Sequence, residues 1–265
     1  MGVDYSIGYG CVPKEALTTE GLISRVKAGE RAQLIEQAYR TQGDTRAADE
    51  MGFEMIYRSA DGDESRRIVR LNDLREMNAE LEAYAHHCQG CPANVLGTAF
   101  GCIGSINYPI SAAAEIWMLQ QLPGPEHPVP FLLLKQGPEY GNTGRQAARL
   151  RADNPGVFFE NAEPLARRFE DVQVSAEQLF ELMFLLGNIP PKRAVMILLF
   201  LGGLSPEIRP DALMALTPPP ENAAQQYPFL LAPEDTDDAS IRDLKAFLKT
   251  LHMAVMLDRP VLLDV

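Results

Sequence analysis

Hydrophobic and polar residues alternate in four short segments of the N-terminal half of the chain. Residues 3–9 show the period of a half-buried strand, with apolar residues at every second position. Residues 53–57 and 68–71 show the same alternation on either side of an Asp-Gly pair, which predicts a hairpin. Residues 106–110 alternate again, which predicts a fourth strand.

Between these strands, the apolar residues recur with the spacing of α-helices. Residues 15–42 predict helix, which Gly29 splits into two. Asn72 is a good N-cap for a helix whose apolar positions run from 74 to 84. The resulting order, β-α-β-β-α-β, is that of the ferredoxin-like, or split βαβ, arrangement. We therefore predict an α+β protein whose ferredoxin-like N-terminal half covers residues 1–110.

The second half, residues 111–265, predicts a mainly α-helical domain. Ser175 and Gln178 form a capping-box pattern, which marks the start of a helix. Between residues 179 and 201 two helices are predicted to be apolar on nearly every face, which is typical of buried helices. We interpret this pair as the core hairpin of the second domain. The alternative is an interface for a homodimer or another protein partner through residues 179–201.

A connection and one more helix follow this pair. Residues 217–239 are rich in proline, glutamine and acidic residues, which predicts an exposed, mobile connection. Ser240 is then predicted to cap a last helix, and residues 261–263 predict a short final strand.

The charge and composition of the chain indicate which partners and which location we expect for the protein. The chain has 265 residues, a formal net charge of −12 and a pI of about 4.8, so we expect it not to bind nucleic acid. Arg66, Arg67 and Arg70 form a small basic cluster, which we interpret as part of a solvated face. No secretory signal opens the sequence, and its longest apolar run, 194–201, is too short to span a bilayer. We therefore expect a cytoplasmic protein that does not insert into a membrane.

The four cysteines lie in the first 102 residues. In a split βαβ sheet the fourth strand pairs antiparallel with the first, so the end of one meets the start of the other. Cys11 follows the first predicted strand, Cys102 precedes the fourth, and Cys88 and Cys91 follow the second helix. The sequence thus predicts that Cys11, Cys88, Cys91 and Cys102 converge at one end of one sheet.

Four thiolates at short range are the ligands of a tetrahedral zinc ion, and Cys-x2-Cys is a common half-site. A closed site of this kind is structural. We interpret His86 and His87 as exposed residues at a helix end, with either as a substitute ligand if Cys11 lies too far away. An iron–sulfur cluster is the second option for the same residues. A redox dithiol is a third, which the position of Cys88 after a helix C-terminus disfavours. Four buried cysteines without a ligand are the remaining alternative.

No catalytic signature accompanies the cysteines. The phosphate-binding, nucleophile-elbow and zinc-protease patterns are all missing from the sequence. Polar residues close to the cysteines fit either a second shell around a metal or a small substrate pocket; they are Asn94, Ser105, Asn107, Tyr108 and Ser111.

Two functions fit these features. The first is a binding or regulatory module stapled by a metal ion, with zinc as the expected ion. The alternative is an iron–sulfur or cysteine-dependent redox enzyme with its site near the cysteine cluster.

Overall fold

The structure, a computed structural model, describes residues 2–58, 64–137, 141–169, 172–209, 211 and 216–264. The chain forms two compact units. Unit 1 comprises Met1–Tyr9, Pro92–Gly97 and Gly101–Val265, and unit 2 comprises Gly10–Cys91 and Thr98–Phe100. These units are not the segments 1–110 and 111–265 predicted from the sequence, because the first strand of the chain belongs with the C-terminal part.

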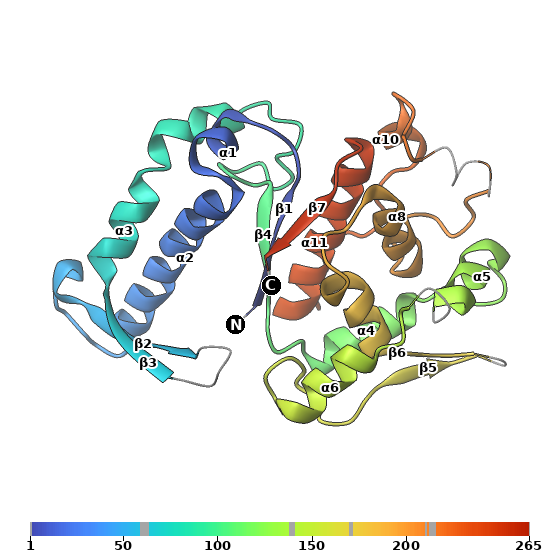
Figure 1. Cartoon of the computed structure of the whole chain (residues 1–265), viewed down its shortest axis with the longest axis horizontal. Coiled ribbons are helices and arrows are strands. Elements are labelled where there is room, and N and C mark those ends of the chain that lie inside the picture. The colour runs from blue at the N-terminus through green and yellow to red at the C-terminus, as the bar shows by residue number, and fades with distance from the viewer. Residues whose placement is uncertain are drawn as a thin grey trace. The chain divides into compact units, whose positions relative to one another are not determined.

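Unit 1 contains a three-stranded antiparallel sheet with the order β4-β1-β7, visible in Figure 1 as a blue strand between a green and a red one. Val3 lies opposite Ile106 in β4, and Tyr5 lies opposite Leu263 in β7. The strands of unit 1 are β1 (Gly2–Ile7), β4 (Ile103–Asn107), β5 (Ala166–Arg168), β6 (Gln173–Ser175) and β7 (Val261–Asp264).

The helices of unit 1 surround a core of aromatic side chains. They are α4 (Ala112–Gln121), α5 (Pro128–Gln136), α6 (Arg145–Asp153), α7 (Ala176–Phe180), the π-helical turn η4 (Glu181–Leu185), α8 (Pro191–Phe200), α10 (Ala223–Gln226) and α11 (Ala239–Met256). Tyr5 contacts Phe247 of α11 with ring centroids 5.0 Å apart, and Phe247 contacts Phe184 at 5.2 Å. Phe184 in turn contacts Phe180 at 5.2 Å, so one aromatic chain joins the sheet to three helical segments.

The apolar helices between residues 179 and 201 lie in this core. Leu179, Phe180 and Phe184 are at most 1% exposed, and Ala194 to Leu201 are buried apart from Met196. The predicted burial of this pair is therefore confirmed, although α8 packs mainly against α11 rather than against α7 as a hairpin partner. Its apolar faces are used within the chain, which removes the observation that suggested a partner interface there.

One predicted helix start agrees with the structure, because Ser175 and Gln178 form the predicted capping box. Ser111 caps α4 by accepting a hydrogen bond from the N–H of Ala114. The last helix differs, because Asp238 rather than Ser240 is its N-cap, with Oδ1 accepting from the N–H of Ile241 at 2.8 Å.

Residues 217–239 contact the rest of unit 1 at several points. The N–H of Leu230 donates to the carbonyl of Gly203 at 3.2 Å, and the carbonyl of Ala232 accepts from Lys245 Nζ at 2.9 Å. The mobility of this connection stays a prediction.

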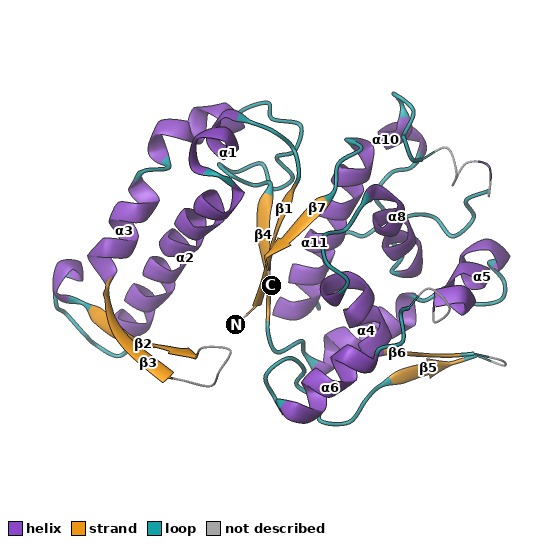
Figure 2. Ribbon diagram, viewed as in Figure 1, coloured by secondary structure: helices purple, strands orange, loops and turns teal. Residues whose placement is uncertain are grey.

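Unit 2 consists of two long helices and a β-hairpin, and Figure 2 shows the hairpin at one end of the helix pair. Its elements are α1 (Val12–Leu17), α2 (Thr19–Thr41), η1 (Ala48–Glu50), β2 (Gly52–Arg58), β3 (Glu64–Arg70), α3 (Leu71–Ala79) and η2 (Glu82–Cys88). A small cluster of buried residues lies between the helices and the hairpin: Ala28, Ala32, Met51, Leu71 and Leu74.

The helix break in unit 2 falls at Thr18 rather than at the predicted Gly29. Thr18 has a φ of 63° and its hydroxyl caps α2 by accepting from the N–H of Gly21. Gly29 lies inside α2 where the side chain of Asn78 approaches so closely that a Cβ would lie 2.4 Å from its Nδ2. The glycine thus serves close packing of α2 on α3.

The ferredoxin-like arrangement is not confirmed, although the protein is mixed α and β. The first and fourth strands pair as predicted. Among the described strands, however, β2 and β3 pair only with each other, and the other neighbour of β1 is the C-terminal β7. The turn predicted at Asp61-Gly62 lies outside the described residues. No helix in the described part of the chain is both long and apolar enough to cross a membrane.

Candidate functional site

The four cysteines do not form a metal site. Cys11, Cys88 and Cys91 belong to unit 2, whereas Cys102 belongs to unit 1 and is buried. Within the described residues, which include every cysteine and histidine of the chain, no group of three or more His, Cys, Asp or Glu side chains is placed to hold a metal ion. The zinc-stapled module, and with it the iron–sulfur or cysteine-dependent enzyme, are therefore wrong.

Local hydrogen bonding explains the positions of Cys88 and Cys91, which were predicted to lie in a metal site. The helix expected to run on to Cys88 ends at Ala79, and a 3-10 helix follows it. The Sγ of Cys88 accepts a hydrogen bond from the N–H of Phe100 at 3.2 Å, and the Cys91 N–H donates to the Cys88 carbonyl at 3.4 Å. The Cys-x2-Cys spacing thus reflects a turn and not a half-site. The rings of His86 and His87 lie against each other, with their centroids 3.9 Å apart.

Three of the polar residues that follow the cysteines make contacts within unit 1. Asn107 donates to Asp243 Oδ2 through both its backbone N–H and its Nδ2. Burial nevertheless raises the pKa of Asp243. The hydroxyl of Ser111 donates to Asp238 Oδ2 at 2.5 Å, which ties the N-terminus of α4 to that of α11. Tyr108 packs against Phe180, and burial raises its pKa well above the usual range of a tyrosine. These contacts do not describe a substrate pocket.

A buried ion network joins three helices of unit 1. Arg151 in α6 donates through Nε to Glu177 Oε1 at 2.6 Å and through Nη2 to Glu115 Oε1. Its guanidinium lies over the ring of Phe159, with 3.8 Å between Cζ and the ring centroid. Asn161 donates to the second oxygen of Glu115 at 3.0 Å. Because a guanidinium already satisfies both carboxylates, we assign this network to the fold rather than to a ligand.

The β2–β3 hairpin of unit 2 carries an exposed apolar side chain near the centre of β3. Ile68 is 75% exposed, more than any other large hydrophobic side chain in the described part of the chain. Arg66 and Arg70 stand two positions before and after it, so the three side chains share one face of β3. Val69 points to the other face, where it packs against the buried cluster together with Phe53.

The register of the hairpin identifies which backbone groups point away from β2. Leu71 lies opposite Met51 in the continuation of this register, and its N–H donates to the Met51 carbonyl at 3.0 Å. Hydrogen-bonded and non-bonded pairs alternate along an antiparallel ladder. The backbone groups of Arg66, Ile68 and Arg70 therefore face outward, at the edge of β3 that β2 does not cover.

The two edges of the hairpin differ. On the β2 side, the outward carbonyl of Gly52 accepts a hydrogen bond from the hydroxyl of Tyr39 in α2 at 2.7 Å, which also supports the assignment of the ladder. On the β3 side, no hydrogen bond within the described residues reaches the outward backbone groups of Arg66 or Ile68 or the N–H of Arg70, whereas the Arg70 carbonyl, as the N-cap of α3, accepts from the first turn of that helix. The edge of β3 is thus an open hydrogen-bonding edge with an exposed aliphatic side chain at its middle.

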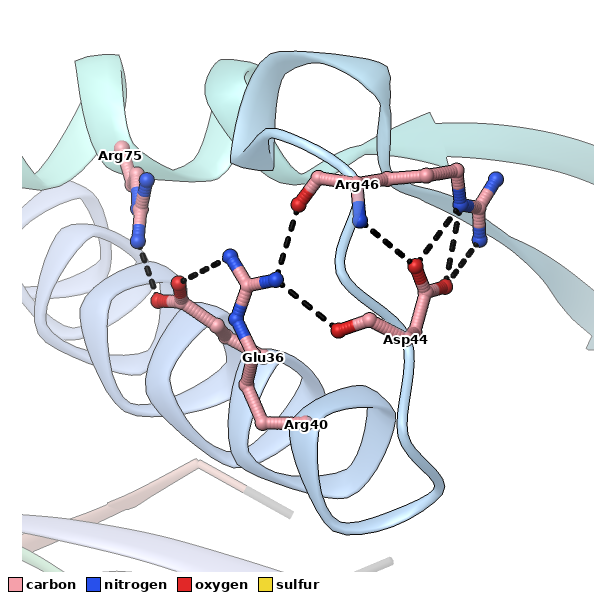
Figure 3. A network of polar contacts seen from close by, with 5 residues as sticks. All are labelled: Glu36, Arg40, Asp44, Arg46 and Arg75. Carbon is pink, nitrogen blue, oxygen red and sulfur yellow. Dashed lines mark hydrogen bonds and ion pairs between the residues drawn. The ribbon is translucent and has the colours of Figure 1, made fainter.

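A network of arginines and carboxylates fixes the loop that leads into this hairpin (Figure 3). Arg40 of α2 donates to the carbonyls of Asp44 and Arg46 at 3.0 and 2.9 Å. Glu36 accepts from Arg40 and from Arg75 of α3, which links the two helices. Hydrogen bonds from the Arg46 guanidinium lower the pKa of Asp44 to about 2. The loop therefore holds its shape through charge-assisted hydrogen bonds, which places the start of β2 on α2 and α3.

Sequence reasoning recognised the arginines of this strand but not its open edge. The cluster Arg66, Arg67 and Arg70 was interpreted as a solvated face, and all three side chains are indeed exposed. The alternation of residues 68–71 indicated a strand but not which neighbour each edge would have. The one signal available was Ile68 itself, an aliphatic residue on the same strand face as two arginines.

Comparisons of the chain with models of known protein families, with curated proteins and with solved structures find no match.

Proposed function

We propose that the protein is a polypeptide-binding module that accepts an extended segment of a partner as an additional strand along β3. The observation that carries this proposal is the open edge of β3 with Ile68 exposed at its centre. A free strand edge offers a row of N–H and C=O groups to an incoming chain. Addition of a strand to such an edge is a recurring mode of peptide recognition, in which main-chain hydrogen bonds give affinity and alternate side chains give specificity.

The competing explanation is that β3 is an edge strand guarded by charge. Arginine residues on an edge strand do discourage association between sheets. Isoleucine does favour strand structure, but a charged residue at this exposed position would guard the edge better. Ile68 therefore favours a contact surface over a purely protective one.

Support from the fold is the way the hairpin is anchored on the helices of unit 2. The loop before β2 is held by the Arg40 and Arg46 hydrogen bonds, and β3 runs directly into α3. A strand edge that is already ordered loses less conformational entropy on binding than a disordered segment would.

The test is a fluorescence anisotropy titration of the full chain against labelled seven-residue peptides. The peptides are Thr-Glu-Thr-Val-Thr-Glu-Thr and its glutamine and lysine counterparts, all of which can form a strand. A peptide with proline in place of the central valine is the negative control, because proline cannot donate to a ladder. We expect at least one of the first three to bind and the proline peptide not to bind.

Variants of Ile68 place the contact on β3. Ile68→Pro removes an N–H that faces away from β2 and is expected to abolish binding. Ile68→Ala keeps that N–H, removes the aliphatic contact and is expected to weaken binding. Leu34→Ala, at an exposed leucine of α2, is the matched control and should bind like the wild type. Circular dichroism checks that each variant is folded. Failure of all three peptides to bind the wild type would overturn the proposal, as would normal binding to both Ile68 variants.

A further inference from the structure

We infer that the segment bound by β3 is acidic, with carboxylate side chains two positions before and two positions after a central aliphatic residue. This inference rests on the proposed strand addition and specifies its partner. The observation behind it is the order of side chains on the outward face of β3, where Arg66, Ile68 and Arg70 stand at every second position.

Alternate residues of an added strand would face these three side chains. Residues directly opposite each other on neighbouring strands have Cβ atoms about 4.5–5.5 Å apart, close enough for ion pairs and apolar contacts. An aliphatic residue opposite Ile68 would cover its exposed surface. The residues two positions on either side would then lie opposite Arg66 and Arg70, where aspartate or glutamate fits best.

The hairpin itself leaves these guanidinium groups largely uncompensated. Arg70 lies opposite Gly52, which has no side chain to offer, and it forms no ion pair within the described residues. Arg66 approaches Glu54 Oε2 only at 3.4 Å, and both side chains are more than half exposed. A pair of that kind contributes little and can be exchanged for another carboxylate.

The arrangement is symmetric about Ile68, with an arginine at the same spacing on each side. The matching pattern in a partner, acidic-x-aliphatic-x-acidic, therefore reads the same in both chain directions. The side chains of β3 can therefore match the same partner sequence whether the added strand runs parallel or antiparallel to β3.

The same symmetry argues against a second copy of this chain as the partner. Pairing two β3 strands about Ile68 in the antiparallel direction places Arg66 opposite Arg70 of the other copy. Like charges directly opposite each other destabilise a strand pair. The chain as a whole carries −12 and repels an acidic partner at long range, but screening confines that repulsion to about 8 Å at physiological salt. Arg66 and Arg70 therefore dominate the electrostatic interaction with a strand bound along β3.

The experiment uses the same titration with the full chain. We expect the glutamate peptide to bind about tenfold or more tightly than the lysine peptide, with the glutamine peptide between them. At roughly 1 M salt, where screening acts within about 3 Å, the affinity for the glutamate peptide should fall toward that for the glutamine peptide.

A charge-reversed protein separates recognition from folding. Arg66→Glu together with Arg70→Glu should invert the preference, so that the lysine peptide binds more tightly than the glutamate peptide. Arg31→Glu together with Arg149→Glu changes the net charge equally at exposed positions of α2 and α6, outside the β2–β3 hairpin, and should keep the wild-type preference. If the charge-reversed protein binds the lysine peptide more tightly than the wild type does, the change cannot be due to unfolding, because an unfolded variant would lose binding.

The outcomes distinguish this inference from the proposed function. If glutamate, glutamine and lysine peptides bind equally and the proline peptide does not, strand addition stands and the acidic preference is overturned. The preference is also overturned if the charge-reversed variant binds the peptides in the same order as the wild type. If no peptide binds and sedimentation shows a dimer that Ile68→Pro disrupts, the edge serves a second copy, and both proposals are overturned.

Discussion

Arg151 is the residue whose loss is expected to destabilise unit 1 most. Its side chain is 5% exposed and satisfies Glu115 and Glu177, whose side chains are 0% and 4% exposed. It also donates through Nη1 to the carbonyl of Asn161 at 2.6 Å. Arg151→Met keeps much of the side-chain volume but removes every one of these hydrogen bonds and the only guanidinium between the two carboxylates.

The magnitude follows from what remains behind. Removing one member of a buried ion pair costs about 3–5 kcal/mol, because the other member stays buried without its countercharge. Here two carboxylates are left, so we expect the upper half of that range, about 4–5 kcal/mol. The cost is a large fraction of the roughly 5–15 kcal/mol that stabilises a typical domain.

The assay is urea unfolding followed by the fluorescence of Trp117, the only tryptophan of the chain, which lies on α4 in unit 1. The matched control adds Glu115→Gln and Glu177→Gln to Arg151→Met, which removes the uncompensated charges while keeping side-chain size. We expect this triple variant to regain most of the lost stability and to lie within about 2 kcal/mol of the wild type. A single variant within about 1 kcal/mol of the wild type would refute the reasoning, as would a triple variant no more stable than the single one.

Three further predictions concern unit 1 and can be followed by the same tryptophan signal. Lys245→Met should cost about 3 kcal/mol, because the buried Asp237 carboxylate loses an ammonium group at 2.8 Å. Burial alone would raise the pKa of Asp237, but hydrogen bonds from Lys245 and the backbone outweigh burial and lower that pKa. The wild type should therefore lose stability as the pH falls below 3.8, the ordinary pKa of an aspartate. The Lys245→Met variant should lose less stability over the same pH range. Burial lowers the pKa of His252 despite its hydrogen bond to the Tyr227 carbonyl, so stability should decline as the pH falls below 6.5, and His252→Gln should flatten that decline. Arg167→Ala should cost about 1–2 kcal/mol, because its guanidinium donates to three carbonyls at the C-terminal end of α4.

Local signals in the sequence predicted local structure well. The alternation of residues 3–9 placed β1, and the capping box at Ser175 placed the start of α7, because both patterns depend on neighbours a few residues away. The apolar pair between 179 and 201 was buried as predicted, since helices without a polar face have no stable exposed position.

Pairing between distant segments could not be predicted in the same way. Alternation in β1 indicates that one of its faces is buried. It does not indicate that β7, from the other end of the chain, is its second neighbour, or that residues on both faces of β1 are buried. The cysteine site failed for the same reason: the order of strands suggested convergence, but three cysteines belong to unit 2 and Cys102 to unit 1. Chain order does not determine which segments pack into one unit.

The open edge depends on the same kind of information. The sequence shows Ile68 between two arginines, but whether its backbone groups face β2 or solvent depends on the register of the hairpin. A shift of one residue would turn the edge groups inward and move every side chain to the opposite face. Only the structure supplies that register.

Amide hydrogen exchange along β3 shows whether its outer edge is open and accepts a strand. In the free protein, the amides of Arg67 and Val69 should be protected by β2, whereas those of Arg66, Ile68 and Arg70 should exchange rapidly. Saturation with the glutamate peptide should protect these three outward amides, and the proline peptide should not. Protection of the outward amides in the free protein, or no change in any of them on saturation with the peptide, would contradict the account.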